Sequence, residues 1–364
     1  MRKTISGAGF IAAVVITIGI AGWPQHGEAQ DAGVNAGNDE RLARFFERFP
    51  EADANGDGNL TLAEARAFAA KRKENRGKEA KGASAPKPFR SDVRYGEHER
   101  NVYDLWLPEG GDDAESPLPL LVYFHGGGFV GGDKSTFDPR SYLREGFAVV
   151  SVNYRLVDGK TTVSPVPFHD SARVIQHLRH HAQDWNLDPA RVVVSGGSAG
   201  AVISMWIGYH DDLADPEAED PVARESTRVS SIAPINGPTQ LDPVWILENL
   251  GGPPEVHSSF PKLFGAGVND LEANPEVQAL VREASPMEHV TPDDVPTLLL
   301  YKGGLGGIPL PPTASQGKVI HHAWFGKALK EKLDEAGVPN EFHPDLGKPL
   351  APTVAEWARK HWDG

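Results

Sequence analysis

Residues Val192–Gly208 read VVVSGGSAGAVISMWIG, and this stretch decides the fold. The β-branched run Val192–Val194 predicts a buried strand, and the apolar pattern after Ser198 predicts a helix. The G-x-S-x-G motif between them contains Gly196 and Gly200, which have no Cβ and let strand and helix approach closely. A strand–turn–helix context makes this motif a nucleophile elbow, with the serine held in a strained backbone. The stretch therefore predicts a nucleophile at the carboxyl end of a strand.

A second motif lies about seventy residues upstream in the sequence LLVYFHGGGF, residues Leu120–Phe129. The apolar run predicts a buried strand that leads directly into His125 and three glycines. A turn of this kind places backbone N–H groups where an oxyanion would develop beside a serine nucleophile. The two motifs, each after a strand and in this order, support each other.

On these motifs, residues from about 92 to 364 resemble an α/β-hydrolase of the esterase/lipase group. The sequence is similar to hormone-sensitive-lipase-like and feruloyl-esterase-like carboxylesterases with an HGGG motif. The resemblance covers roughly three quarters of the chain and is close up to about Gly208. It implies an α/β fold with a mostly parallel, doubly wound sheet.

The remaining elements agree with this fold class. Short alternating segments at Val93–Tyr95 and Val102–Leu107 predict an opening antiparallel pair. Continuous apolar runs at Leu118–Phe124 and Phe147–Val152 are typical of strands buried on both faces of a parallel sheet. Strands that alternate with helices such as Phe168–Trp185 predict a doubly wound sheet, with the site at the carboxyl ends of its strands.

An insertion from about residue 238 to 291 is rich in Pro and Gly, with helical pieces at Trp245–Leu250 and Glu276–Ala284. In families of this kind such an insertion shapes the substrate pocket. Trp245, Phe260 and Phe264 are then either pocket walls or packing residues of the insertion. Upstream, the pair His169-Asp170 opens a predicted helix, so we interpret Asp170 as a cap or a loop anchor.

Composition excludes several classes of function. The chain has 364 residues and a formal net charge of −14, which argues against nucleic-acid binding because no basic face is present to neutralise phosphates. It contains no cysteine, which rules out disulfides and thiolate metal sites.

The N-terminus predicts export from the cytoplasm. Arg2 and Lys3 precede an apolar stretch from Ile5 to Ala21, and small residues precede a cleavage point after Ala29. This pattern is typical of a signal peptide, residues 1–29, and an uncleaved membrane anchor is the alternative. Either interpretation places the folded part in the periplasm or outside the cell, and a cleaved chain would have no membrane partner.

Residues 38–75 predict a separate calcium-binding module of the EF-hand type. An amphipathic helix with Leu42, Phe45, Phe46 and Phe49 on one face precedes the loop DANGDGNLTLAE. Gly58 stands at the sharp turn of this loop, and every ligand position is filled, by Asp53, Asn55, Asp57, Asn59, Thr61 and Glu64.

The alternative is a polar turn between two helices. A single loop with three carboxylates is typical of a structural Ca²⁺ site at millimolar calcium. Residues 76–91 predict a solvated linker to the hydrolase domain at 92–364.

Two of the three expected triad positions are substituted. The resemblance implies an acid around Leu305, after the strand Val295–Tyr301, yet no Asp or Glu occurs from Val295 to Lys330. The triad histidine should follow the last strand, Asn340–His343, where Lys348 stands instead.

Three interpretations therefore compete. In the first, the partners are displaced: His321-His322 supply the base, with His322 as the first candidate, and Asp242 supplies the acid. In the second, the protein is a catalytically inactive pseudo-enzyme that binds a ligand outside the cytoplasm in a calcium-dependent manner. In the third, Lys348 or Lys302 is a buried base with a lowered pKa.

The first interpretation implies a secreted serine ester hydrolase of weak or unorthodox activity. Ser198 attacks an acyl carbonyl, the N–H groups of Gly126, Gly127 and Ala199 hold the oxyanion, and a histidine transfers the proton. The expected partner is a small-molecule or carbohydrate ester.

Overall fold

The structure is a computed structural model that describes residues Asn35, Leu42, 52–68 and 86–362. The chain divides into two compact units, Met1–Ala85 and Pro86–Gly364, and each is described by itself. The predicted signal peptide, the three phenylalanines of the first amphipathic helix and residues 76–85 of the predicted linker lie outside the described residues. The last residues of that predicted linker belong to the first strand, which begins at Arg90.

One eight-stranded sheet, in the order β1-β2-β4-β3-β5-β6-β7-β8, forms the centre of the larger unit. β2 runs antiparallel to β1 and β4, and all other neighbours are parallel. The strands are β1 (Arg90–Arg94), β2 (Val102–Trp106), β3 (Leu118–Phe124), β4 (Ala148–Asn153), β5 (Leu187–Gly197), β6 (Ser231–Ile235), β7 (Thr297–Leu300) and β8 (Asn340–His343). The predicted mostly parallel, doubly wound sheet is confirmed, including its antiparallel opening pair.

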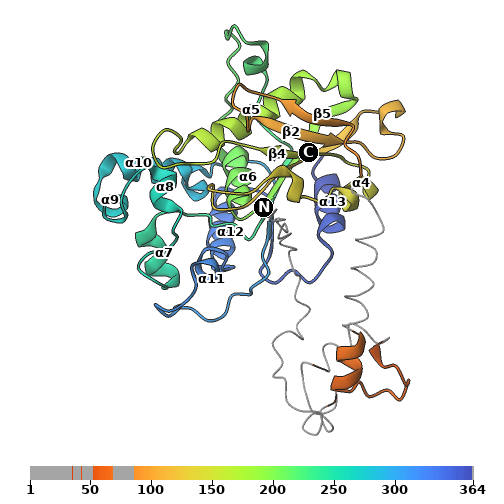
Figure 1. The fold of residues 1–364 in the computed structure, drawn as a ribbon, viewed down its shortest axis with the longest axis vertical. Helices are drawn as coiled ribbons and strands as arrows, with labels where there is room; N and C mark the ends of the chain where they lie inside the picture. The colour runs from red at the N-terminus through yellow and green to blue at the C-terminus, as the bar shows by residue number, and fades with distance from the viewer. Residues whose placement is uncertain (1–34, 36–41, 43–51, 69–85, 363–364) are drawn as a thin grey trace, which may run out of the picture. The chain divides into compact units, whose positions relative to one another are not determined.

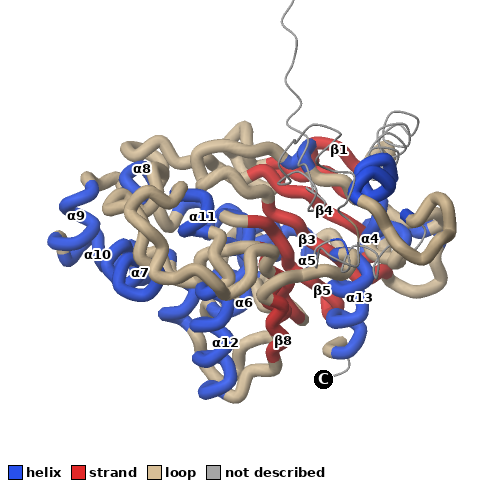
Figure 2. Tube along the Cα trace, turned by 90° about the horizontal axis from the view of Figure 1, so that it is seen from below, coloured by secondary structure: helices blue, strands red, loops and turns tan. Residues whose placement is uncertain are grey.

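Helices cover both faces of this sheet (Figures 1 and 2). The α-helices are α4 (Arg140–Arg144), α5 (Val166–His180), α6 (Ala199–Tyr209), α7 (Pro243–Leu250), α8 (Phe260–Phe264), α9 (Val268–Ala273), α10 (Pro275–Ala284), α11 (Gln316–Ile320), α12 (Trp324–Ala336) and α13 (Leu350–Lys360). Short 3₁₀ helices are η2 (Gly111–Asp113), η3 (Lys134–Thr136), η4 (Gln183–Trp185), η5 (Pro221–Arg224) and η6 (Pro286–His289). No helix among the described residues is long and apolar enough to cross a membrane.

The apolar strand runs follow from burial on both faces. Leu121 of β3 and Val193 of β5 belong to the buried cluster beneath α4 and α13, whereas Val122 and Val194 belong to the cluster on the side of α5, α6 and α12. Successive strand residues point to opposite faces, so a strand covered on both sides needs apolar residues at every position.

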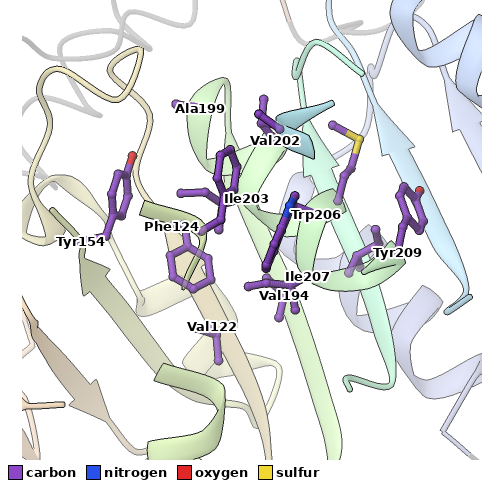
Figure 3. Packing of buried hydrophobic residues seen from close by; sticks show 14 of the residues in the cluster. Val122, Phe124, Tyr154, Val194, Ala199, Val202, Ile203, Trp206, Ile207 and Tyr209 are labelled. Carbon is purple, nitrogen blue, oxygen red and sulfur yellow. The ribbon is translucent and has the colours of Figure 1, made fainter. Parts of the chain in front are cut away.

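Figure 3 shows helix α6 packed against the central strands of the sheet. Ile203, Trp206 and Ile207 of this helix are buried in the same cluster as Phe124 and Val194. The contact is closest at Gly200, where a Cβ atom would lie 2.0 Å from the carbonyl oxygen of Phe124. Only glycine fits this crossing of helix and strand.

The insertion contains more structure than the sequence predicts. The two helical pieces expected there correspond to α7 and α10, but α8 and α9 were not expected. Each has six residues or fewer, too short to show a helical period.

In the smaller unit, Thr61 forms an isolated antiparallel bridge with Asn35, and a helix covers residues 62–68. Leu42, Leu60 and Ala65 are fully buried. This part of the chain therefore has an apolar centre beside its polar loop.

The close crossing at Gly200 gives a stability prediction. Gly200→Ala places a methyl group against the Phe124 carbonyl, and we expect a loss of about 1–3 kcal/mol in the free energy of unfolding. Urea unfolding of residues 30–364 measures it. Gly303→Ala is the matched control, because a Cβ there meets nothing within 4 Å. Equal stability of the two variants would contradict the packing described here.

Candidate active site

Ser198 occupies the sharp turn between β5 and α6. Its φ of 56° and ψ of −116° put a non-glycine residue in a backbone region that costs of order 1–3 kcal/mol. The turn is held because the Ser198 N–H donates to the Ile235 carbonyl at 3.0 Å and its own carbonyl accepts from Ala201 and Val202. The surrounding structure therefore fixes the serine at the carboxyl end of β5, as the sequence predicts.

The residue that meets this serine is His321. Its Nε2 atom lies 2.8 Å from the Ser198 Oγ atom, within hydrogen-bond distance. His321 directly follows α11, which comes after the long loop that leaves β7. Sequence analysis singled out the pair His321-His322 and placed His322 first; the geometry favours its neighbour.

Burial and one backbone contact set the state of the His321 ring. Burial is the main cause that lowers the pKa of His321, and a hydrogen bond to the Gly317 backbone opposes it. Since Nε2 faces the serine, we assign the Gly317 contact to the other ring nitrogen, Nδ1. A ring protonated at Nδ1 leaves the Nε2 lone pair free to accept the serine proton.

His322 has a different environment. Its ring is buried, Nδ1 accepts from the Trp324 N–H at 3.1 Å, and Nε2 lies 3.2 Å from the Gly306 carbonyl. Both ring nitrogens are thus occupied in joining the loop after β7 to the start of α12. The expectation that His322 transfers the proton is not supported by this geometry.

Asp242 does not orient the base either. Its carboxylate caps α7 by accepting the Val244 N–H at 2.9 Å. Among the described residues, no hydrogen bond or ion pair joins a carboxylate to His321. The expectation that Asp242 is the acid therefore has no contact to support it.

The alternative lysine base requires a buried amine, and both candidates are exposed. Lys302 and Asp345 form an isolated antiparallel bridge between the loops that follow β7 and β8. His343, at the end of β8, faces Glu341 at 2.7 Å. The resemblance places the acid in the loop after β7 and the base in the loop after β8. In this chain the bridge joins these two loops to each other.

The glycine turn after β3 lies directly against the nucleophile. A Cβ on Gly126 would come within 3.4 Å of the Ser198 Cβ, and Gly127 has a φ of 116° that favours glycine. Among the described residues, the backbone N–H groups of Gly126, Gly127 and Ala199 donate to no other group. Free donors beside the serine are what an oxyanion hole requires.

His125 anchors this turn. Its ring stacks on Tyr154 at 4.4 Å, and its Nδ1 atom lies 2.8 Å from the Gly126 carbonyl. Arg100 approaches the other nitrogen at 3.2 Å, and because guanidinium can only donate, His125 accepts there and donates from Nδ1. Burial lowers the pKa of His125, which agrees with a neutral ring. His125 therefore positions the oxyanion turn rather than reacting.

A small pocket opens beside Ser198. It encloses about 270 Å³ of empty volume, counting the part open to solvent, and is lined by Gly128, Val202, Leu241, His257, Ser259 and Phe260 among others. Its walls are mainly apolar, with one polar corner where His257 Nδ1 lies 2.7 Å from Ser259 Oγ. Sequence analysis did not single out these two residues, because His-Ser-Ser is unremarkable within a loop.

The other aromatic residues proposed as walls pack elsewhere. Trp245 stacks on Phe325 at 5.9 Å, and Phe264 contacts Phe260 edge-on. Phe260 alone of the three lines the pocket. Asp170 anchors a loop, as one of its two interpretations held: it is buried, and its two carboxylate oxygens accept from Nε–H and Nη2–H of Arg155.

Comparison with known proteins points to one group of enzymes. The model of the BD-FAE family matches residues 103–304, more than half of the chain. Among curated proteins, Probable carboxylesterase 3 of Arabidopsis thaliana is 35% identical over 130 residues, 32% of this chain and 40% of that protein. Esterase LipI of Mycobacterium tuberculosis is 36% identical over 115 residues, 30% of this chain and 35% of that protein. The matches thus span less than half the length of these relatives.

Solved structures agree on the fold. A truncated carbohydrate esterase from gut microbiota aligns with a TM-score of 0.58 at 17% identity, over 76% of this chain and 96% of its own. An acetyl ester-xyloside bifunctional hydrolase from Caldicellulosiruptor lactoaceticus aligns with a TM-score of 0.55 at 23% identity, over 77% and 97%. At these identities the likeness shows an α/β-hydrolase fold.

The environment of His321 gives a titration prediction. Because burial disfavours the imidazolium, we expect His321 to titrate below the ordinary histidine pKa of about 6.5 and to be neutral at pH 7. NMR titration of histidine ring signals, assigned with His321→Gln, measures the midpoint. A midpoint above 6.5 would contradict the buried environment described for this ring.

Proposed function

This chain belongs to the BD-FAE family of α/β-hydrolase esterases, and we propose that it hydrolyses carboxylic esters through a Ser198–His321 pair without a triad acid. The proposal rests on the 2.8 Å contact between Ser198 Oγ and His321 Nε2. Beside this contact lie the backbone N–H groups of the glycine turn, which donate to no other group among the described residues. The pseudo-enzyme interpretation assumed that no base lies beside Ser198, and the contact with His321 argues against it.

The reaction follows from the positions of these groups. Ser198 Oγ attacks the acyl carbonyl while His321 Nε2 accepts its proton. The N–H groups of Gly126, Gly127 and Ala199 stabilise the oxyanion. The imidazolium then protonates the leaving alcohol, and a water activated by the same nitrogen releases the acyl group from the serine.

The Gly317 carbonyl takes over part of the acid's role. A hydrogen bond to Nδ1–H selects the required tautomer and holds the ring. A neutral carbonyl stabilises the imidazolium less than a carboxylate does, because hydrogen bonds to charged groups are worth roughly 1–2 kcal/mol more. We therefore infer a rate about tenfold or more below that of a complete triad.

The pocket favours a short acyl group. Its empty volume of about 270 Å³ includes space that is open to solvent, so the enclosed part beside Ser198 is smaller still. Phe260 and Leu241 close it with apolar surface. We infer that the substrates are small-molecule or carbohydrate esters of short acids.

Kinetics of p-nitrophenyl esters test the proposal. We expect His321→Gln to lower kcat/KM about 10²–10⁴-fold on p-nitrophenyl acetate, since a general base contributes that factor. Ser198→Ala removes the nucleophile and should lower kcat/KM at least as far. His343→Gln and Asp242→Asn should retain most activity, and p-nitrophenyl octanoate should be a poorer substrate than the acetate. Full activity of a folded His321→Gln variant would refute the base assignment.

We also propose that the loop Asp53–Glu64 binds one structural Ca²⁺ ion. The side chains of Asp53, Asn55 and Asp57 turn into the loop and accept its N–H groups at 2.8 Å, and Gly58 makes the sharp turn with a φ of 79°. Hydrogen bonds from Thr61 lower the pKa of Glu64, so its carboxylate is charged near neutral pH. Carboxylate and amide oxygens are the ligands that Ca²⁺ prefers.

Export remains a prediction from residues 1–29, which lie outside the described part of the chain. A loop with three carboxylates suits extracytoplasmic calcium concentrations, with a Kd of about 10⁻⁴–10⁻³ M. The calcium proposal and the export proposal therefore support each other.

Calcium titration checks the loop. We expect isothermal titration of residues 30–364 to show one Ca²⁺ bound and Glu64→Gln to abolish binding at millimolar calcium, because this residue is the bidentate ligand. Asp112→Asn, an exposed acid of the larger unit, is the matched control. Binding that survives Glu64→Gln would locate the ion elsewhere.

A further inference from the structure

Two histidines and a glutamate meet at the end of the nucleophile helix, away from the reactions described above. His210 directly follows α6, Glu283 lies in α10, and His289 is the last residue of η6. Each offers one ligand atom, and these atoms lie within 4.8 Å of one another. Among the described residues, no other group of three His, Asp or Glu side chains meets this condition.

The second nitrogen of each histidine is already engaged. His210 Nδ1 lies 3.2 Å from the Asp211 carbonyl, and His289 Nε2 lies 2.7 Å from the Glu283 carbonyl. Since a carbonyl only accepts, these nitrogens carry the protons. In the neutral rings Nε2 of His210 and Nδ1 of His289 then carry the lone pairs, and the former lies 3.3 Å from a carboxylate oxygen of Glu283. Histidines that ligate metals are oriented in this way by backbone carbonyls.

Trp206 fixes two of the three residues. Its ring stacks on His210 with centroids 4.2 Å apart, and its Nε1–H donates to the Glu283 carbonyl at 3.0 Å. Trp206 itself is almost completely buried, so it forms a rigid support. An ordinary ion pair would account for His210 and Glu283, but not for a third ligand atom within reach of the same carboxylate.

We propose that His210, Glu283 and His289 bind a divalent transition-metal ion, with Zn²⁺ as the best fit. Two imidazoles and one carboxylate are zinc ligands, and the half-buried cluster leaves a fourth position for water. The ligand atoms must close to about 3.3 Å for tetrahedral Zn–N distances of 2.0–2.1 Å, which modest side-chain rotation provides.

Such an ion would join the nucleophile helix to the insertion. Glu283 and His289 belong to the insertion, and His257, Ser259 and Phe260 of the same insertion line the pocket at Ser198. The ion would thus stabilise the segment that shapes the pocket by mass action, and the effect would grow with the logarithm of the free ion concentration above its Kd.

Zinc titration of residues 30–364 tests this proposal. A Glu64→Gln background removes the calcium loop, and EDTA treatment removes bound metal. We expect one equivalent of Zn²⁺ to bind and to raise the unfolding temperature. His289→Asn and Glu283→Gln should weaken binding at least about a hundredfold, more than the loss of a group that only orients a ligand. Co²⁺ should give a visible spectrum typical of four- or five-coordinate nitrogen and oxygen ligands.

Controls separate this site from other histidines. His181→Asn alters the contact between His181 and Asp184, which lies away from the proposed zinc ligands. His321→Gln removes the histidine beside Ser198. Both variants should keep the zinc equivalent and the cobalt spectrum. Zinc-free unfolding curves establish that each variant folds. Unchanged zinc affinity in folded Glu283→Gln and His289→Asn variants, or no stoichiometric zinc in the parent, would overturn the proposal.

Discussion

The close contact of α6 with the end of β3 is the constraint on which the site depends. With a Cβ at Gly200 the helix would collide with the Phe124 carbonyl, and with a Cβ at Gly196 the strand would collide with Gly200. Because both positions are glycine, the helix starts close to the sheet and Ser198 is forced into its strained conformation. The same approach brings the oxyanion turn after β3 against the serine. Nucleophile and oxyanion donors are thus consequences of one packing contact.

The position of the proposed base, His321, depends less directly on this packing contact. His321 directly follows a five-residue helix that comes after a long loop, and its ring contacts the Gly317 backbone one turn earlier. The neighbouring His322 is held by Gly306 and Trp324. This pair of contacts fixes the rotation of the segment, so that one histidine faces the serine and the other faces the loop. The His321 ring is therefore oriented by backbone and loop contacts, with no carboxylate in contact with it among the described residues.

What could be predicted from the sequence follows from how local each signal is. The elbow, the glycine turn and the positions of the strands are encoded in short contiguous segments, so they were predicted with their residues. The choice between His321 and His322 depends on helix rotation set by distant backbone groups, which no local pattern reports. For Asp242 the sequence contains a signal against a catalytic role. An Asp directly before a Pro at the start of a helix is a typical N-cap, and in the structure Asp242 caps α7. The zinc ligands come from three elements, and only the fold brings them together.

The central claim is that His321 activates Ser198, and covalent labelling tests it most directly. A fluorophosphonate probe reacts only with an activated serine in a formed oxyanion hole, and it needs no knowledge of the substrate. We expect stoichiometric labelling of residues 30–364 at Ser198, located by peptide mass spectrometry, and a rate at least about 10²-fold lower in His321→Gln. Absence of labelling in the folded parent protein, or equal rates in the parent and in His321→Gln, would contradict the account.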